Sequence, residues 1–148
     1  MSASNVKAIP EGFHAVTPYI TASDARAVID FLKRAFDATV GECLEDGQGR
    51  IRHAQVKLGD SHLMLTDGND ECRPTPAAFY LYLTDVDSAY DRALRAGGAS
   101  VMEPADQFYG DRNAGVRDKC GNTWWLATHI EDVPSEEIAR RARAAGGA

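Results

Sequence analysis

Two histidines lie in a stretch of alternating polar and apolar residues, IRHAQVKLGDSHLMLT (51–66). Gly59 and Asp60 in its middle predict a two-residue hairpin turn. Alternation then gathers six side chains on one face, namely His53, Gln55, Lys57, His62, Met64 and Thr66. Imidazoles bind metals and transfer protons near neutral pH. The two imidazoles are nevertheless separated by about 13 Å of strand, too far for bonds of about 2 Å to one metal ion.

A second stretch, DKCGNTWWLATHIED (118–132), reads as a turn followed by a strand with two adjacent tryptophans. Because successive side chains of a strand point to opposite faces, Trp124 and Trp125 have different surroundings. We expect Trp124 to pack in the core and Trp125 to lie on the face of Thr123 and Ala127. Trp125 is then available to stack on a planar or cationic group.

The composition limits the classes of protein. With 148 residues, 44% of them hydrophobic and 26% charged, the chain can form one compact domain with a core. The net charge of −6 argues against nucleic acid as a partner. We expect a cytoplasmic protein without membrane contact, because neither a signal-type apolar block nor an apolar run of roughly 20 residues is present. Cys43, Cys72 and Cys120 lack paired spacing, which predicts reduced thiols.

An internal repeat organises the chain. A shift of 61 residues aligns 19–42 with 80–103, with eight identities in 24 positions. Each copy has an alternating strand, an Asp that can cap a helix, and short strands after the helix. Gly97 is expected to end the second helix. The order predicts an α+β fold of two tandem βαβββ modules; two unrelated amphipathic helices of similar composition are the alternative.

We expect one domain over residues 1–148. Its parts are a first module at about 12–66, a linker at 67–77, a second module at about 78–130 and a C-terminal helix at about 134–145. Pro74 and Pro76 indicate the linker. In the tail, acidic residues precede arginines, which is the polarity that a helix dipole favours.

This arrangement resembles the glyoxalase/bleomycin-resistance/dioxygenase superfamily, also called vicinal oxygen chelate proteins. The stretches 53–65, DQFYGDR (106–112) and VRDKCGNTWWLATHIEDV (116–133) are similar to its PhnB-like branch. The resemblance implies a curved eight-stranded cup made by both modules, with helices outside and a small-molecule site within, in a homodimer. It does not imply one chemistry, because this fold serves unrelated reactions.

Many members of that superfamily hold a divalent metal at four strand positions. These correspond here to Thr17, Met64, Ala78 and Trp125. None of the four is a usual metal ligand, so we expect neither a metal nor another cofactor in the cup. His14 and His129 lie near strand ends, where solvated or hydrogen-bonded imidazoles are common.

Aromatic and polar residues line the expected cup instead. The candidate ligand-binding residues are Thr17, Tyr19, His53, Gln55, His62, Met64, Tyr80, Tyr82, Tyr109 and Trp125. Such a lining suits planar or cationic ligands. In the loop 107–112, either Tyr109 and Arg112 meet the ligand as a lid, or an Asp–Arg pair pins the loop. For Trp125 the alternative is that its ring only fills the cup.

Two functions follow. In the first, the protein binds an aromatic or cationic small molecule without metal, as drug-sequestering members of the superfamily do. In the second, it is a glyoxalase-like lyase or isomerase with an unusual metal or acid–base site, in which His53, His62, Lys57 or a tyrosine moves protons. The residues at the family's metal positions favour the binder. Whether a reaction is catalysed, and by which residues, stays open.

Overall fold

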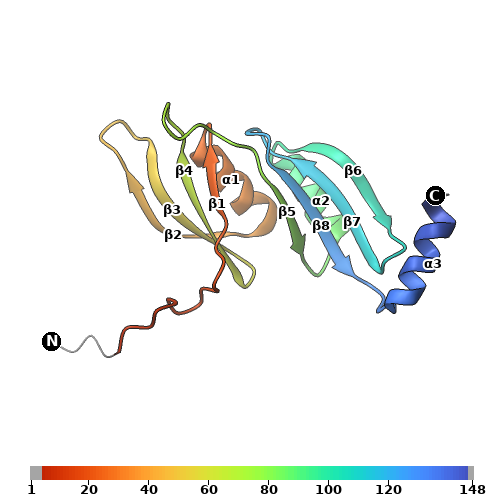
Figure 1. Ribbon diagram of the computed structural model, residues 1–148. Helices are drawn as coiled ribbons and strands as arrows, with labels where there is room; N and C mark the ends of the chain where they lie inside the picture. The colour runs from red at the N-terminus through yellow and green to blue at the C-terminus, as the bar shows by residue number, and fades with distance from the viewer. Residues whose placement is uncertain (1–4, 147–148) are drawn as a thin grey trace. The chain divides into compact units, whose positions relative to one another are not determined.

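The computed structural model describes residues 5–146, which form two compact units divided between Pro76 and Ala77. Each unit contains a four-stranded mixed sheet with one helix packed on one face (Figure 1). The predicted α+β class and the duplicated βαβββ order are confirmed, and the eight strands form two four-stranded sheets. None of the described helices is long and apolar enough to cross a membrane.

The first unit consists of β1 (Tyr19–Ala22), α1 (Ala25–Phe36), β2 (Thr39–Glu45), β3 (Ile51–Leu58) and β4 (Ser61–Asp67). Its strand order is β1-β4-β3-β2. β1 runs parallel to β4, and the other neighbours are antiparallel. The first and last strands of the module are therefore neighbours, and α1 makes the crossover between β1 and the rest of the sheet.

The second unit repeats this plan with β5 (Ala78–Tyr82), α2 (Val86–Arg95), β6 (Ala99–Asp106), β7 (Asp111–Arg117) and β8 (Thr123–His129). Its strand order is β5-β8-β7-β6, with β5 parallel to β8. A final helix, α3 (Ser135–Gly146), follows β8.

The repeat predicted the helix starts correctly. The side chain of Asp24 accepts a hydrogen bond from the backbone N–H of Ala27, and Asp85 accepts one from Ser88, both at 3.1 Å. These bonds satisfy backbone donors that the first turn of a helix leaves without partners. α2 buries side chains at i, i+3, i+4 and i+7, which are Val86, Ala89, Tyr90 and Ala93. It ends before Gly97, whose φ of +99° a glycine adopts without strain.

The hairpin of β3 and β4 has the predicted register, with Lys57 opposite His62 and Gln55 opposite Met64. The alternate side chains face α1 and are buried, namely Ala54, Val56, Leu58, Leu63 and Leu65. The strand pair therefore buries its apolar face against α1, and its polar face lies on the opposite side of the sheet. Lys57 is exposed, as expected for a side chain near the end of the hairpin.

A buried carboxylate organises the turn between β7 and β8. Oδ1 of Asp118 accepts hydrogen bonds from the backbone N–H groups of Cys120 (2.9 Å) and Asn122 (3.0 Å). Its Oδ2 accepts from the side-chain amide of Asn122 (3.0 Å) and from the indole N–H of Trp124 (2.9 Å). Trp124 is 1% exposed, which confirms its predicted place in the core. Trp125, one residue later, lies on the opposite face.

We predict that Asp118→Ala lowers the free energy of unfolding by about 2–4 kcal/mol. The change removes the carboxylate that accepts hydrogen bonds from the buried amide of Asn122 and the indole of Trp124, and each such loss costs about 1–3 kcal/mol. Urea denaturation followed by circular dichroism measures the effect. Asp70→Ala, an exposed carboxylate in the linker, serves as the control and should change stability by less than about 0.5 kcal/mol. Equal losses in both variants would contradict the assigned role of Asp118.

Candidate functional site

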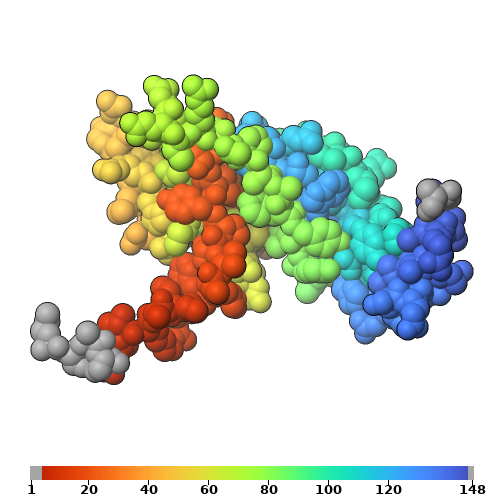
Figure 2. Space-filling view, viewed as in Figure 1, coloured from red at the N-terminus to blue at the C-terminus, as the bar shows by residue number. Residues whose placement is uncertain are grey.

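The second sheet carries a pocket of about 290 Å³ on the face opposite α2. Its lining residues are Tyr80, Met102, Gln107, Tyr109, Asn113 and Trp125. Atoms of β5 (green) and β8 (blue) both reach the surface of this unit (Figure 2). Ligand pockets commonly measure about 300–1,000 Å³, so this one suits a small molecule of one or two rings.

Gly115 gives Trp125 its position in the pocket. The two residues lie opposite each other on β7 and β8. A Cβ atom at position 115 would lie 2.6 Å from Cζ3 of Trp125, which is closer than van der Waals contact allows. The indole ring therefore rests against the bare backbone of β7, and a glycine is needed for this close approach. Trp125 remains half-buried, so part of its ring is available to a ligand.

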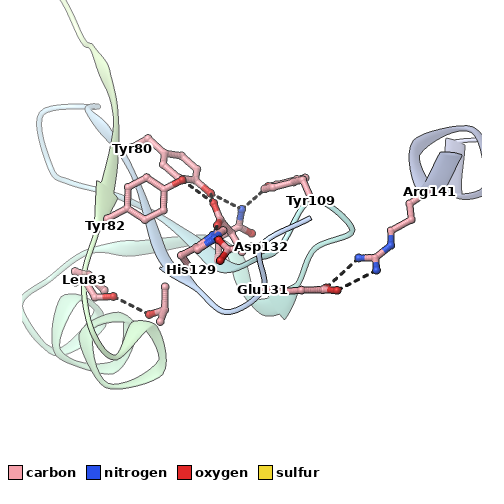
Figure 3. Close-up of polar contacts among 11 residues, drawn as sticks. Tyr80, Tyr82, Leu83, Tyr109, His129, Glu131, Asp132 and Arg141 are labelled. Atoms are coloured by element: carbon pink, nitrogen blue, oxygen red, sulfur yellow. Dashed lines mark hydrogen bonds and ion pairs between the residues drawn. The ribbon is translucent and has the colours of Figure 1, made fainter. Parts of the chain in front are cut away.

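The turn that carries Tyr109 is held from two sides. Gly110 has a φ of +103°, and its carbonyl oxygen accepts the backbone N–H of Glu131 at 3.1 Å. A Cβ atom at position 110 would lie only 2.2 Å from the carbonyl oxygen of Glu131. From α3, the guanidinium of Arg141 donates to the carbonyl oxygen of Phe108 at 3.1 Å and pairs with Glu131 (Figure 3). These contacts fix the backbone on either side of Tyr109.

A buried carboxylate, Asp111, lies at the centre of a hydrogen-bond network beside the pocket. Figure 3 shows Tyr80, Tyr82 and His129 of this network. Its Oδ2 accepts the hydroxyl protons of Tyr80 (2.7 Å) and Tyr82 (3.0 Å). Its Oδ1 lies 2.8 Å from Nδ1 of His129. The other imidazole nitrogen, Nε2, lies 2.7 Å from Oδ1 of Asp132. Both carboxylate oxygens of Asp111 are therefore occupied.

This network fixes the charges of its members. Burial alone would raise the pKa of Asp111, but the hydrogen bonds from His129 and the two tyrosines outweigh it and hold this pKa below its usual value. The pKa of His129 is raised, first by its bond to Asp111 and then by its bond to Asp132. The pKa of Tyr80 is raised chiefly by burial, and that of Tyr82 chiefly by its bond to Asp111. The phenols therefore stay protonated donors.

Asn113 joins this network to the pocket. Its Nδ2 donates to the hydroxyl oxygens of Tyr80 (3.2 Å) and Tyr109 (2.5 Å). The residue is 3% exposed. Its Oδ1 is buried and has no hydrogen-bond partner within the part of the chain that the structure describes. A buried amide normally pairs both ends, so this oxygen is an exception.

The first unit holds other predicted residues on the face of its sheet opposite α1. The hydroxyl of Tyr19 lies 2.9 Å from Nδ1 of His53, and Tyr19 pairs with Met64 across β1 and β4. Gln55 and His62 line a separate hollow of about 210 Å³.

His53 and His62 have different partners, in agreement with the predicted separation. Nδ1 of His62 lies 3.1 Å from the carbonyl oxygen of Gly12, and its ring stacks on Phe13 with centroids 4.1 Å apart. Thr17 precedes β1 and is half-buried.

Of the ten candidates, Tyr80, Tyr109 and Trp125 line one pocket, and Tyr82 joins them through its hydrogen bond to the adjacent carboxylate. The suggestion that Arg112 meets a ligand is wrong, because its side chain points toward the helix side of the sheet. There its guanidinium binds Asp87 of α2 through two contacts of 2.8 Å and Asp106 at 3.0 Å. An Asp–Arg pair thus spans the loop, but its acid is Asp106, while Asp111 of the loop bonds to the two tyrosines and His129. Tyr109 lines the pocket.

Sequence reasoning missed Asp111, Asn113 and His129 as a connected group. Alternation along DRNAGVR (111–117) places Asp111, Asn113 and Gly115 on one face. Since Gly115 pairs with Trp125 and Asp111 pairs with His129, this face is the one that carries the pocket. The alternation of β7 therefore places these residues on one face, but only the register of β7 and β8 identifies that face as the one with Trp125.

The residues at the family's four metal positions do not fit a divalent cation. They are threonine, methionine, alanine and tryptophan, which offer neither imidazole nor carboxylate. Within residues 5–146, no group of three or more His, Cys, Asp or Glu side chains is arranged to hold a metal ion. The donor set therefore differs from that expected of a metal-dependent member.

Comparison with known proteins gives a family and several relatives. The model of the Glyoxalase/Bleomycin resistance protein/Dioxygenase superfamily matches residues 12–126. Uncharacterized protein Mb0911c of Mycobacterium bovis is 33% identical over 135 residues, which cover 84% of this chain and 89% of the relative.

Solved structures share the fold. TnmS3, an antibiotic binding protein from Streptomyces sp. CB03234, has a TM-score of 0.63 at 24% identity, covering 84% of this chain and 99% of its own. The PhnB protein from Bacillus cereus has a TM-score of 0.62 at 19% identity, covering 78% of this chain and 99% of its own.

We predict that His129 titrates above the ordinary imidazole pKa of about 6.5. NMR titration of the imidazole signals measures this. Asp111→Asn and Asp132→Asn should each lower the pKa of His129, because both carboxylates raise it. An unchanged pKa in Asp111→Asn would contradict the network.

The sign of the effect on stability follows from linkage. A raised folded-state pKa means that the contact stabilises the fold fully below about pH 6.5 and that this stabilisation is lost as the pH rises through the folded-state value. We therefore expect the difference in unfolding free energy between the natural protein and His129→Gln to shrink as the pH rises through that value.

Proposed function

The chain belongs to the Glyoxalase/Bleomycin resistance protein/Dioxygenase superfamily, and we propose that its second unit binds a small aromatic or cationic molecule against Trp125. The observation that carries this proposal is the pocket of about 290 Å³ beside that ring. Three aromatic rings, a methionine and two side-chain amides line it, which is the mixture of apolar area and few polar groups typical of ligand sites.

The chemistry of the lining supports stacking. An indole ring held against bare backbone is a rigid, flat surface, and Tyr80 and Tyr109 add aromatic area beside it. Aromatic pairs contribute about 0.5–1.5 kcal/mol beyond area burial, and cations gain a similar amount over a ring face. TnmS3, which shares the fold, is an antibiotic binding protein, and this agrees with a binding role for the present chain.

Binding in this proposal requires no metal. The support is the donor set, since the family's four metal positions carry no imidazole or carboxylate. We expect elemental analysis of protein purified without a histidine tag or chelator to find far less than one zinc, nickel, iron or manganese per chain. A near-stoichiometric metal would contradict the proposal and direct attention to His53, His62 and the glutamates.

The proposal extends to the state of the protein in the cell. We propose a homodimer, on the resemblance to the superfamily, and a cytoplasmic location, on the sequence expectation given above. Sedimentation analysis checks the dimer, and fractionation of cells checks the location.

A lyase or isomerase of glyoxalase type is the second candidate function. The observation in its favour is the Tyr80–Asp111–His129 network, which places a proton-carrying imidazole two hydrogen bonds from the pocket. The raised pKa of Tyr80 keeps its phenol protonated and makes it a weak acid, so in this reading the imidazole of His129 would be the group that gives or takes a proton. Asp111→Asn distinguishes the two functions. The variant should lower the turnover rate of an enzyme steeply, whereas it should leave ligand stacking on Trp125 in place.

We predict that ligand binding quenches Trp125 fluorescence. Addition of one- and two-ring aromatic compounds, including N-methylquinolinium, should quench the natural protein, and Trp125→Phe should lose most of that quench because Trp124 is buried. Trp125→Ala should weaken binding about tenfold in calorimetry, the equivalent of about 1.4 kcal/mol of stacking. Tyr19→Phe, in the first unit, is the control. A full quench retained by Trp125→Phe would exclude this site.

A further inference from the structure

The unpaired amide oxygen of Asn113 is the strongest unexplained feature of the pocket. Asn113 is 3% exposed, and its Oδ1 lacks a partner in the described part of the chain. Leaving a buried acceptor unsatisfied costs about 1–3 kcal/mol. A fold accepts such a cost most readily where a ligand removes it.

The orientation of this amide is fixed by its neighbours. The hydroxyl of Tyr80 gives its proton to the ionised Asp111, so only lone pairs of Tyr80 remain for Asn113. An amide must therefore turn its N–H₂ group toward Tyr80, and the same group also donates to Tyr109. Rotating the amide by half a turn would place two acceptors together at Tyr80. The free end is thus the carbonyl oxygen, an acceptor that needs a donor.

From this geometry we propose that the pocket selects planar ligands that carry an N–H donor, as in lactams and amino-heterocycles, and that Asn113 accepts this hydrogen. The inference rests on the proposed function, because it assigns a ligand class to the same pocket. Stacking on Trp125 places the ligand, and the hydrogen bond to Asn113 fixes which edge of the ligand points inward.

Access to Asn113 requires a side chain to move, since its Oδ1 exposes no surface. Tyr109 is suited to this. Among residues 5–146, its hydroxyl has one hydrogen bond, to Asn113, and its ring has an edge contact with Phe108 at 5.2 Å between centroids. Rotation of the Tyr109 side chain breaks that bond, which a ligand carbonyl next to the N–H can replace. A lactam edge therefore matches both ends of the Asn113 amide.

Calorimetry with 2-quinolone and coumarin tests the proposal. The two molecules have the same rings and carbonyl group, and they differ only in an N–H that is a ring oxygen in coumarin. We expect the natural protein to bind 2-quinolone about tenfold more tightly, because coumarin leaves Asn113 unpaired and turns an oxygen toward it. Asn113→Leu should abolish this preference, and Gln48→Leu, an exposed amide in the turn between β2 and β3, should retain it.

The difference in affinity between the two probes is measured on the natural protein, so it does not depend on the folding of Asn113→Leu. Equal affinity for both probes, with quenching of Trp125, would overturn the role of Asn113 and leave the proposed function intact. If neither probe binds at about 1 mM, the inference fails. If N-methylquinolinium fails as well, the proposed function fails with it.

Discussion

One buried hydrogen bond decides which face of β8 carries the pocket. The indole N–H of Trp124 donates to Asp118 at 2.9 Å, and both residues are buried. A tryptophan is rarely accepted in a core unless its N–H has a partner, so this bond determines which of the two tryptophans lies inside. Strand alternation then leaves Trp125 on the other face, opposite Gly115. The pocket depends on this register, because a shift of one residue would exchange the two rings.

The two units share a backbone arrangement but differ in the side chains at matching positions. In the second unit, Tyr80 pairs with Trp125 and bonds to Asn113, which lies two residues after Asp111. At the matching places the first unit has Tyr19, Met64, His53 and Ile51. A buried isoleucine cannot accept hydrogen bonds, so the first tyrosine bonds to an imidazole, and a thioether stands where the second unit has an indole ring. The repeat therefore keeps one tyrosine and differs in the groups around it.

The part of the site that the sequence predicts is the part governed by alternation and by short turns. A two-residue turn at Gly59 and Asp60 fixes the register of β3 and β4, because the strands must pair directly on either side of it. Lys57 therefore lies opposite His62. The turn between β7 and β8 is longer, since Arg117 pairs with Thr123, and a loop of this length does not fix the register of its strands. For this reason the sequence alone does not predict that two tyrosines and a histidine converge on Asp111. This convergence depends on strand partners and side-chain torsions that no local pattern specifies.

The charge of the Asp111 network bears on which molecules the pocket prefers. Tyr80 and Tyr82 occupy one carboxylate oxygen, and His129 occupies the other. The bond to Asp111 raises the pKa of His129 and so favours the charged imidazole, whose charge offsets that of the carboxylate. The six lining side chains of the pocket are themselves uncharged. On the proposed function, selection would then depend on stacking and on matching donors to acceptors rather than on attraction to a net charge.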